Sequence, residues 1–190
     1  MIAHWLVVLA LLLSGCGGGA QKFNSVDITG ANYARDFALT DHTGARRTLA
    51  DYRGKVVAVF FGFTQCPDVC PTTLSDLAQV KKRLGSDGER LQVIFITVDP
   101  ERDSQAVLQR YVPSFDPSFV ALYGSAEQTA ATAKEFKVFY QKAAGKTATS
   151  YSIDHTAGTY VFDRDGRVRL FVRHGEGVEP IVADLKRFLS

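Results

Sequence analysis

Two nearly unbroken apolar runs divide the middle of the chain. Residues 55–63 read Lys-Val-Val-Ala-Val-Phe-Phe-Gly-Phe, and residues 91–98 form a second run of the same kind. Runs this rich in β-branched and aromatic residues are typical of strands that are covered on both faces. Between them, Pro71 and Gly85 predict the start and the end of a helix. Its apolar face carries Leu74, Leu77, Val80 and Leu84. A strand, a helix and a parallel strand predict a right-handed crossover unit.

The same pattern of apolar and polar residues predicts further elements. Two hairpins are expected, at 37–49 and at 158–172, the second with its turn at Asp163-Arg164-Asp165-Gly166. Further helices are expected at 104–111 and 126–136, and a closing helix at 179–189. Two parallel strands, a later hairpin and a closing helix are the order of the thioredoxin fold. The sequence therefore predicts an α/β protein with a mixed central sheet, flanking helices and an N-terminal β-hairpin.

Length, composition and charge exclude several classes of protein. A chain of 190 residues with 46% hydrophobic and 22% charged residues suits one globular domain, and excludes a disordered, collagenous or multi-pass membrane protein. The formal net charge is +2 and no block of like charge stands out, so we expect no nucleic-acid partner.

The first residues predict a targeting signal. Residues 1–15 contain no Lys, Arg, Asp or Glu, and the apolar run at 5–13 would span roughly 14 Å as a helix, against about 30 Å of hydrocarbon. Leu13-Ser14-Gly15-Cys16 resembles the bacterial lipobox, whose cysteine becomes the lipidated first residue; an ordinary signal peptide is the alternative. We expect a lipoprotein signal peptide at 1–15, a lipid-anchored flexible linker at 16–33 and one domain at 34–190. The chain would then lie on the periplasmic side, anchored to the cell membrane.

Two thiols lie in the turn between the first buried strand and the first helix. If lipid modifies Cys16, Cys66 and Cys70 are the only remaining thiols, in an oxidising compartment. Because Pro71 suits the first helical position, Cys70 is expected at the N-cap, where the helix dipole favours a thiolate. Three interpretations of Cys66 and Cys70 are open: a structural disulfide, a redox-active dithiol, or part of a metal site.

One histidine is placed to complete a metal site. His155 lies in a segment that enters the expected strand at 158–162, and in a thioredoxin fold this loop faces the cysteine turn. Oxidoreductases of this fold usually carry a cis-proline there. His42, in a hairpin turn, and His174, after a strand, are expected on the surface.

Two thiolates and an imidazole form a small, soft ligand set. Copper(I) accepts three such ligands, and copper(II) binds if a further donor completes a fourth position. A closed structural zinc site would need a fourth protein ligand that the sequence does not offer. Asp68 either donates an oxygen to copper(II), or tunes the cysteines or contacts a partner. Asp154 is expected to orient the ring of His155.

Three motifs together resemble a known family. Residues 66–74 (Cys-Pro-Asp-Val-Cys-Pro-Thr-Thr-Leu), 97–103 (Thr-Val-Asp-Pro-Glu-Arg-Asp) and 154–158 (Asp-His-Thr-Ala-Gly) resemble the three signatures of the Sco/SenC family. The resemblance extends over roughly residues 34–189. It implies a membrane-tethered copper chaperone of thioredoxin fold that binds one copper ion per chain. The family's copper ligands fall on Cys66, Cys70 and His155.

The resemblance also implies partners and leaves rival functions open. The expected partners are the subunit of cytochrome c oxidase that carries the dinuclear copper A centre, and other copper carriers or thiol reductants. One rival is a thiol–disulfide oxidoreductase, in which Cys66 and Cys70 are catalytic and keep the target's cysteines reduced. The other is a peroxidase, suggested by Thr64 close to Cys66, which would need an activating arginine.

Overall fold

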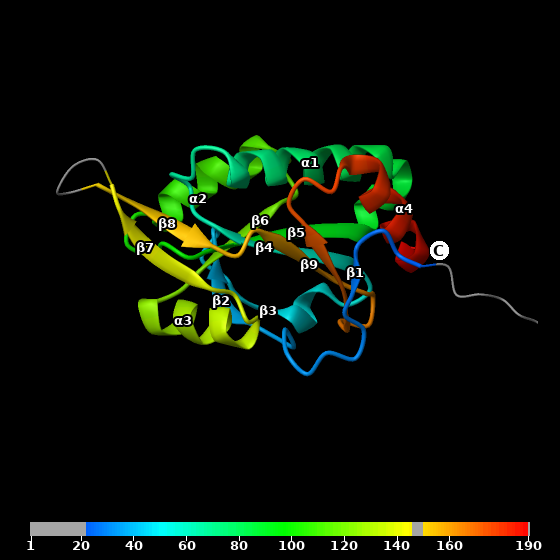
Figure 1. Cartoon of the computed structure of the whole chain (residues 1–190), viewed down its shortest axis with the longest axis horizontal. Helices are drawn as coiled ribbons and strands as arrows, with labels where there is room; N and C mark the ends of the chain where they lie inside the picture. The colour runs from blue at the N-terminus through cyan, green and yellow to red at the C-terminus, as the bar shows by residue number, and fades with distance from the viewer. Residues whose placement is uncertain (1–21, 146–149, 190) are drawn as a thin grey trace, which may run out of the picture.

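One eight-stranded mixed sheet forms the centre of the protein (Figure 1). The computed structural model describes residues 22–145 and 150–189. In spatial order the strands are β1 (Val26–Asp27), β10 (Val168–Arg173), β9 (Gly158–Phe162), β4 (Val56–Gly62), β5 (Leu91–Thr97), β6 (Val120–Tyr123), β2 (Ala38–Asp41) and β3 (Arg46–Thr48). The neighbours β4, β5 and β6 run parallel, and every other pairing in this sheet is antiparallel. A second sheet contains two strands, β7 (Tyr140–Ala144) and β8 (Tyr151–His155).

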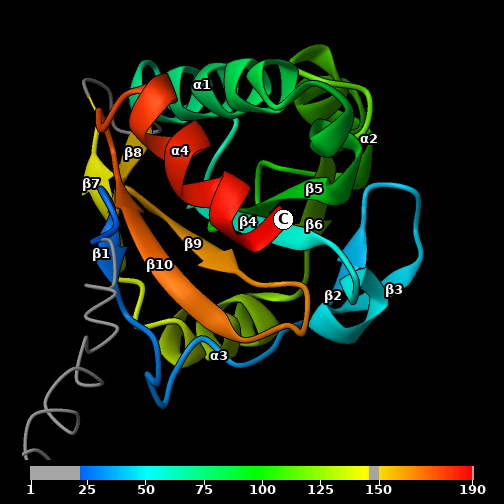
Figure 2. The same ribbon diagram turned by 90° about the vertical axis from the view of Figure 1, so that its right-hand side faces the viewer.

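Helices cover both faces of the main sheet. The helices α1 (Val69–Arg83) and α4 (Val178–Leu189) pack side by side over one face, and α3 (Ala126–Glu135) lies on the other (Figure 2). The remaining helical segments are short: α2 (Gln105–Tyr111), η1 (Leu49–Tyr52), η2 (Gly85–Arg90) and η3 (Val112–Ser114). This arrangement confirms the predicted thioredoxin-like fold with its N-terminal hairpin, which joins the sheet through β2 and β6.

The two apolar runs form the parallel pair at the centre of the sheet. Every residue of β4 and β5 is buried, and the strands pair in register from Val56–Leu91 to Gly62–Thr97. The crossover helix α1 buries its apolar face against them, as the spacing predicted. The carboxyl end of β4 therefore leads directly into the turn that carries both cysteines.

The β7–β8 hairpin is the largest element that the sequence analysis missed. Residues 140–155 alternate weakly, and Ile153 is the one apolar side chain in these two strands that is fully buried. A pattern this weak does not separate a strand from a loop, because strand formation depends strongly on tertiary context. The expected loop position of His155 was therefore wrong: it is the last residue of β8.

The folded domain also begins earlier than expected. Within the expected linker at 16–33, β1 pairs with β10, and the ring of Phe23 stacks on Phe188 with centroids 5.3 Å apart. The backbone N–H groups of Asn24 and Ser25 donate to the Asp184 carboxylate at 3.0 and 2.8 Å. The boundary at residue 34 was therefore wrong, since the preceding residues from Phe23 onward pack on the domain. The expected signal peptide and Cys16 lie outside the described residues.

No helix within 22–145 or 150–189 is both long enough and apolar enough to span a bilayer.

Candidate metal centre

The cysteine turn is fixed at both of its ends. It follows the buried strand β4, and the Cys66 N–H donates to the Phe63 carbonyl at 3.2 Å. Helix α1 begins at Val69 with Asp68 as its N-cap, so Cys70 lies inside the first turn of the helix rather than at the expected N-cap. Pro71 is tolerated as the third helical residue because the first N–H groups of a helix have no intrahelical acceptor.

Three ligand atoms converge at this turn. Cys66, Cys70 and His155 each offer one, and all three atoms lie within 4.8 Å of one another. Both cysteines are free thiols; Cys70 is buried, whereas Cys66 is partly exposed. The Cys70 N–H donates to Cys66 Sγ at 3.3 Å, and Cys70 Sγ lies 3.5 Å from His155 Nε2. The residues singled out from the sequence are therefore brought together.

Cys70 is not the activated thiolate that its helix position suggested. Burial raises the pKa of the Cys70 thiol, and the neighbouring Cys66 raises it further. The helix dipole does not outweigh the cost of placing a negative charge in an apolar site. The protonated thiol of Cys70 is therefore favoured over the thiolate in the metal-free protein.

His155 is held as a neutral ligand. Burial lowers its pKa, since desolvation disfavours the imidazolium. Its Nδ1 lies 3.1 Å from the carbonyl oxygen of Thr156, which can only accept, so Nδ1 carries the proton and Nε2 presents its lone pair toward Cys70. The edges and faces of Phe60 and Phe63 enclose the ring, with centroids 6.1 and 5.9 Å away.

The two aspartates expected beside the site have other positions. Asp154 is exposed, and the backbone carbonyl of Thr156 orients the His155 ring in its place, because Asp154 points to the opposite face of β8. Asp68 is also exposed and accepts a hydrogen bond from Thr72 Oγ1 at 3.3 Å. Neither carboxylate belongs to the cluster of donor atoms found among the described residues.

The other described histidines lie apart from this cluster. His174 is exposed, as expected, and its Nδ1 lies 3.1 Å from Thr73 Oγ1. His42 is half-buried rather than on the surface, because its Nδ1 accepts a hydrogen bond from the N–H of Ala121 in β6 at 3.1 Å.

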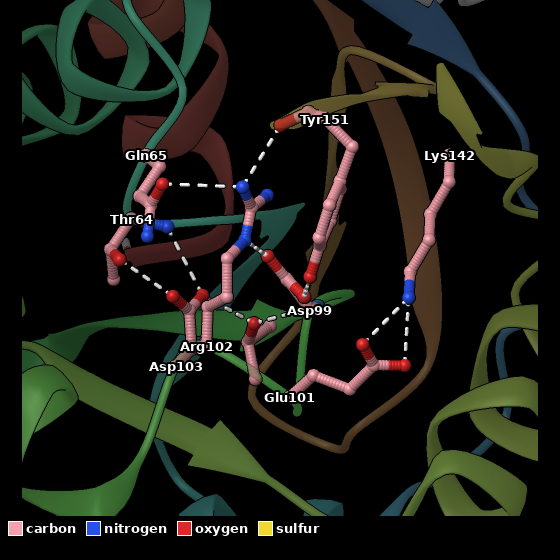
Figure 3. A network of polar contacts seen from close by, with 9 residues as sticks. Thr64, Gln65, Asp99, Glu101, Arg102, Asp103, Lys142 and Tyr151 are labelled. Atoms are coloured by element: carbon pink, nitrogen blue, oxygen red, sulfur yellow. Dashed lines mark hydrogen bonds and ion pairs between the residues drawn. The ribbon is translucent and has the colours of Figure 1, made fainter. Parts of the chain in front are cut away.

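A polar network behind the site was not anticipated from the residues alone (Figure 3). Asp99 and Asp103 follow β5 and are buried. Asp103 accepts hydrogen bonds from Thr97 Oγ1 at 2.6 Å and from the N–H and hydroxyl of Thr64 at 3.0 and 2.5 Å. The Thr64 hydroxyl thus donates to Asp103. A charged Asp-Pro-Glu-Arg-Asp segment after a buried strand was the available signal, but by itself it indicates only a turn.

The arrangement suits a soft metal ion. Two sulfurs and one imidazole nitrogen, gathered at a loop–helix junction with one sulfur partly exposed, offer three ligands and leave room for a fourth. Among the described residues no peptide bond is cis, so the proline conformation usual in thioredoxin-fold oxidoreductases is not found there.

Comparisons with known proteins agree with this chemistry. The family model described as SCO1/SenC matches residues 26–190. The mitochondrial SCO2 homolog of Mus musculus is 38% identical over 157 residues, which cover 82% of this chain and 62% of that protein. The chain thus matches only about three fifths of the length of that relative.

Two solved structures are similar along most of this chain. Bradyrhizobium japonicum ScoI with copper bound is 40% identical with a TM-score of 0.74, over 80% of this chain and 97% of that one. Apo Sco1 from Thermus thermophilus is 42% identical with a TM-score of 0.78, over 90% of this chain and 99% of that one.

Proposed function

Since this chain belongs to the SCO1/SenC family, we propose that it is a membrane-tethered carrier that binds one copper ion and delivers it to the dinuclear copper A centre of cytochrome c oxidase. One observation carries the proposal: ligand atoms of Cys66, Cys70 and His155 lie within 4.8 Å of one another. A relative that is 40% identical was solved with copper bound.

The three ligands suit a cargo that must be both held and released. Copper(I) is satisfied by two thiolates and an imidazole, and copper(II) needs one further donor at the open position. Because Cys66 is partly exposed, an incoming ligand from a partner can approach the metal on its side, while the buried Cys70 and the half-buried His155 still hold it. Copper then leaves by exchange of one ligand at a time.

Protonation and oxidation both control loading. Metal binding needs deprotonated sulfurs and a neutral imidazole. Burial already keeps His155 neutral by lowering its pKa, whereas Cys70, whose pKa burial raises, releases a proton as copper binds. Oxidation to a disulfide would remove both sulfur ligands, so a thiol reductant is an expected partner that restores the carrier.

The rival function is a thiol–disulfide oxidoreductase that keeps the cysteines of the target reduced. Two free thiols close together are compatible with it. We favour copper delivery because His155 Nε2 lies 3.5 Å from Cys70 Sγ and completes a set of three soft ligands, which a dithiol enzyme does not need.

The tether is proposed from sequence alone. Leu13-Ser14-Gly15-Cys16 supports lipid attachment at Cys16 and a position on the periplasmic side of the cell membrane. The intact mass of the protein extracted from bacterial membranes tests this proposal. A mature chain that starts at Cys16 and carries lipid is expected; an unmodified Cys16 would contradict it.

Copper binding by ligand variants tests the central proposal. We expect the reduced full chain to bind one copper per chain and the disulfide form to bind far less. Cys66→Ser, Cys70→Ser and His155→Ala should each lose at least the roughly 10- to 100-fold in affinity that disturbing a supporting group typically costs. His174→Ala, at an exposed histidine outside the cluster, is the matched control. Equal affinity in the reduced and oxidised proteins would contradict the proposal.

A further inference from the structure

The strand that carries His155 has little backbone support. β7 and β8 pair with each other, from Tyr140–His155 to Ala144–Tyr151, and neither belongs to the main sheet. A two-stranded hairpin is at best marginally stable in water. The position of His155 therefore depends on side chains that fasten this hairpin to the rest of the domain.

One face of β8 makes this attachment. Tyr151, Ile153 and His155 alternate with the exposed Ser152 and Asp154, so the first three share the inward face. Ile153 is buried at the centre of that face, and His155 meets the cysteines at one end. Tyr151 lies at the opposite end of this inward face, about 13 Å from His155 along the strand.

Tyr151 is held by Arg102, which Figure 3 shows beside it. The guanidinium carbon lies 3.6 Å from the centroid of the Tyr151 ring, and Arg102 Nη1 donates to the Tyr151 carbonyl at 2.9 Å. Arg102 Nε also donates to the Asp99 carboxylate, which accepts the Tyr151 hydroxyl at 2.8 Å. Arg102, Asp99 and Tyr151 thus form a closed triangle, which we call the hairpin latch.

The latch is attached to a buried part of the domain. Asp99 follows the buried strand β5, its side chain is 0% exposed, and its N–H donates to Thr97 Oγ1 at 3.0 Å. Arg102 reaches the cysteine turn as well, since Nη1 donates to Gln65 Oε1 at 3.2 Å and the guanidinium lies 5.8 Å from the Phe63 ring centroid. One arginine therefore contacts the segments that carry both halves of the metal centre.

We propose that Arg102 is a positioning residue for copper: through Tyr151 it fixes β8 so that His155 Nε2 stays within ligand distance of the two sulfurs. The inference rests on the proposed copper function. With the latch intact, copper meets three ligands already assembled. Without it, Cys66 stays in the turn after β4 and Cys70 stays in α1, but His155 moves with a loosened hairpin, and copper is held mainly by the two sulfurs.

A double-mutant cycle on the full chain tests this role, with copper(I) affinity measured by competition against a chromophoric chelator. Arg102→Gln should lower affinity by about 10-fold, within the range for groups that orient a metal-binding histidine. In a His155→Ala background, Arg102→Gln should cause no further loss, because the residue through which it acts is gone. An equal loss in both backgrounds would overturn the proposal.

Two further variants protect the test against a simple folding defect. Arg102→Gln leaves the Asp99 carboxylate buried without its cation, whereas Tyr151→Phe removes a single hydroxyl and should still lower copper affinity. Ser152→Ala is the matched control: Ser152 lies on the exposed face of the same strand, next to Tyr151, and its removal should leave affinity unchanged. A larger loss from Ser152→Ala than from Tyr151→Phe would contradict the latch.

Amide hydrogen exchange of the copper-free protein separates this inference from the copper function. Arg102→Gln should speed exchange in β7 and β8 but not in β4 or β5. If the wild-type chain binds no copper but this pattern appears, the copper function fails while the latch stands. Unchanged exchange in β8 would refute the latch whatever the copper result.

Discussion

The two halves of the metal centre are built in different ways. The cysteines lie between a central strand and a long helix, where every residue of β4 is buried. The histidine lies on a hairpin outside the main sheet, which is attached through Ile153 and the hairpin latch. A site assembled in this way has one half fixed by the core and one half fixed by a few side chains. The position of His155 therefore depends on a few side-chain contacts, whereas the positions of the two cysteines depend on the packing of the core.

The largest effect is expected from the core of the cysteine half. Leu74 on α1 is fully buried, so Leu74→Ala should lower the free energy of unfolding by about 3–4 kcal/mol, from lost apolar burial plus the cavity left behind. Chemical denaturation measures this change. Gln79→Ala, at an exposed position on the same helix, should have little effect. A loss below about 1 kcal/mol for Leu74→Ala would mean that α1 is not part of the cooperative core.

A smaller global effect is expected from the hairpin. Ile153→Ala removes its central buried side chain and should cost about 2 kcal/mol, at the low end for such changes. Because the hairpin can open separately, amide exchange should accelerate in β7 and β8 and stay slow in β4 and β5. Ser152→Ala, on the exposed face of the same strand, is the control. Equal acceleration in both sheets would show that the two halves open as one unit and would remove the contrast between them.

The smallest effect concerns pH. Burial lowers the pKa of His155 in the folded protein. In the unfolded chain the same imidazole takes up a proton near pH 6.5, whereas in the folded protein it does so only at a lower pH. Between these two pKa values the unfolded state holds more protons, so this contribution to stability falls as pH falls, by at most about 1.4 kcal/mol per pH unit. Denaturation midpoints from pH 7 to 5 should therefore fall less steeply in His155→Gln than in the wild type. Identical slopes would mean that His155 titrates as an exposed histidine does.

Sequence alone predicted the cysteine half well because its signals are local and strong. The apolar run of β4 and the spacing of Leu74 and Leu77 on α1 leave little choice of structure. Even there the fine placement of Cys70 was wrong by two positions, and burial reversed the expected direction of its pKa shift. Helix position suggests a stabilised thiolate, but only tertiary structure shows how much solvent remains.

For the histidine half, the sequence predicted the metal-binding residue but not the strand that carries it. The residue type and the family resemblance identified His155, whereas the strand that holds it was missed. Tyr151 and Arg102 are 49 residues apart, and neither carries a local pattern that points to the other. Asp154, adjacent to His155 in sequence, was expected to orient the ring, but alternation along the strand turns it outward and leaves that role to the Thr156 carbonyl.

The first described residues and the metal centre lie at opposite ends of one strand. Phe23 stacks on Phe188, which lines the same surface groove as Gly54 near the amino end of β4, whereas the cysteine turn follows the carboxyl end. In Figure 1 the chain enters the domain beside the end of α4. The seven residues of β4 span about 23 Å. Any attachment through the N-terminal segment would therefore hold the domain at the end that lies away from the cysteine turn.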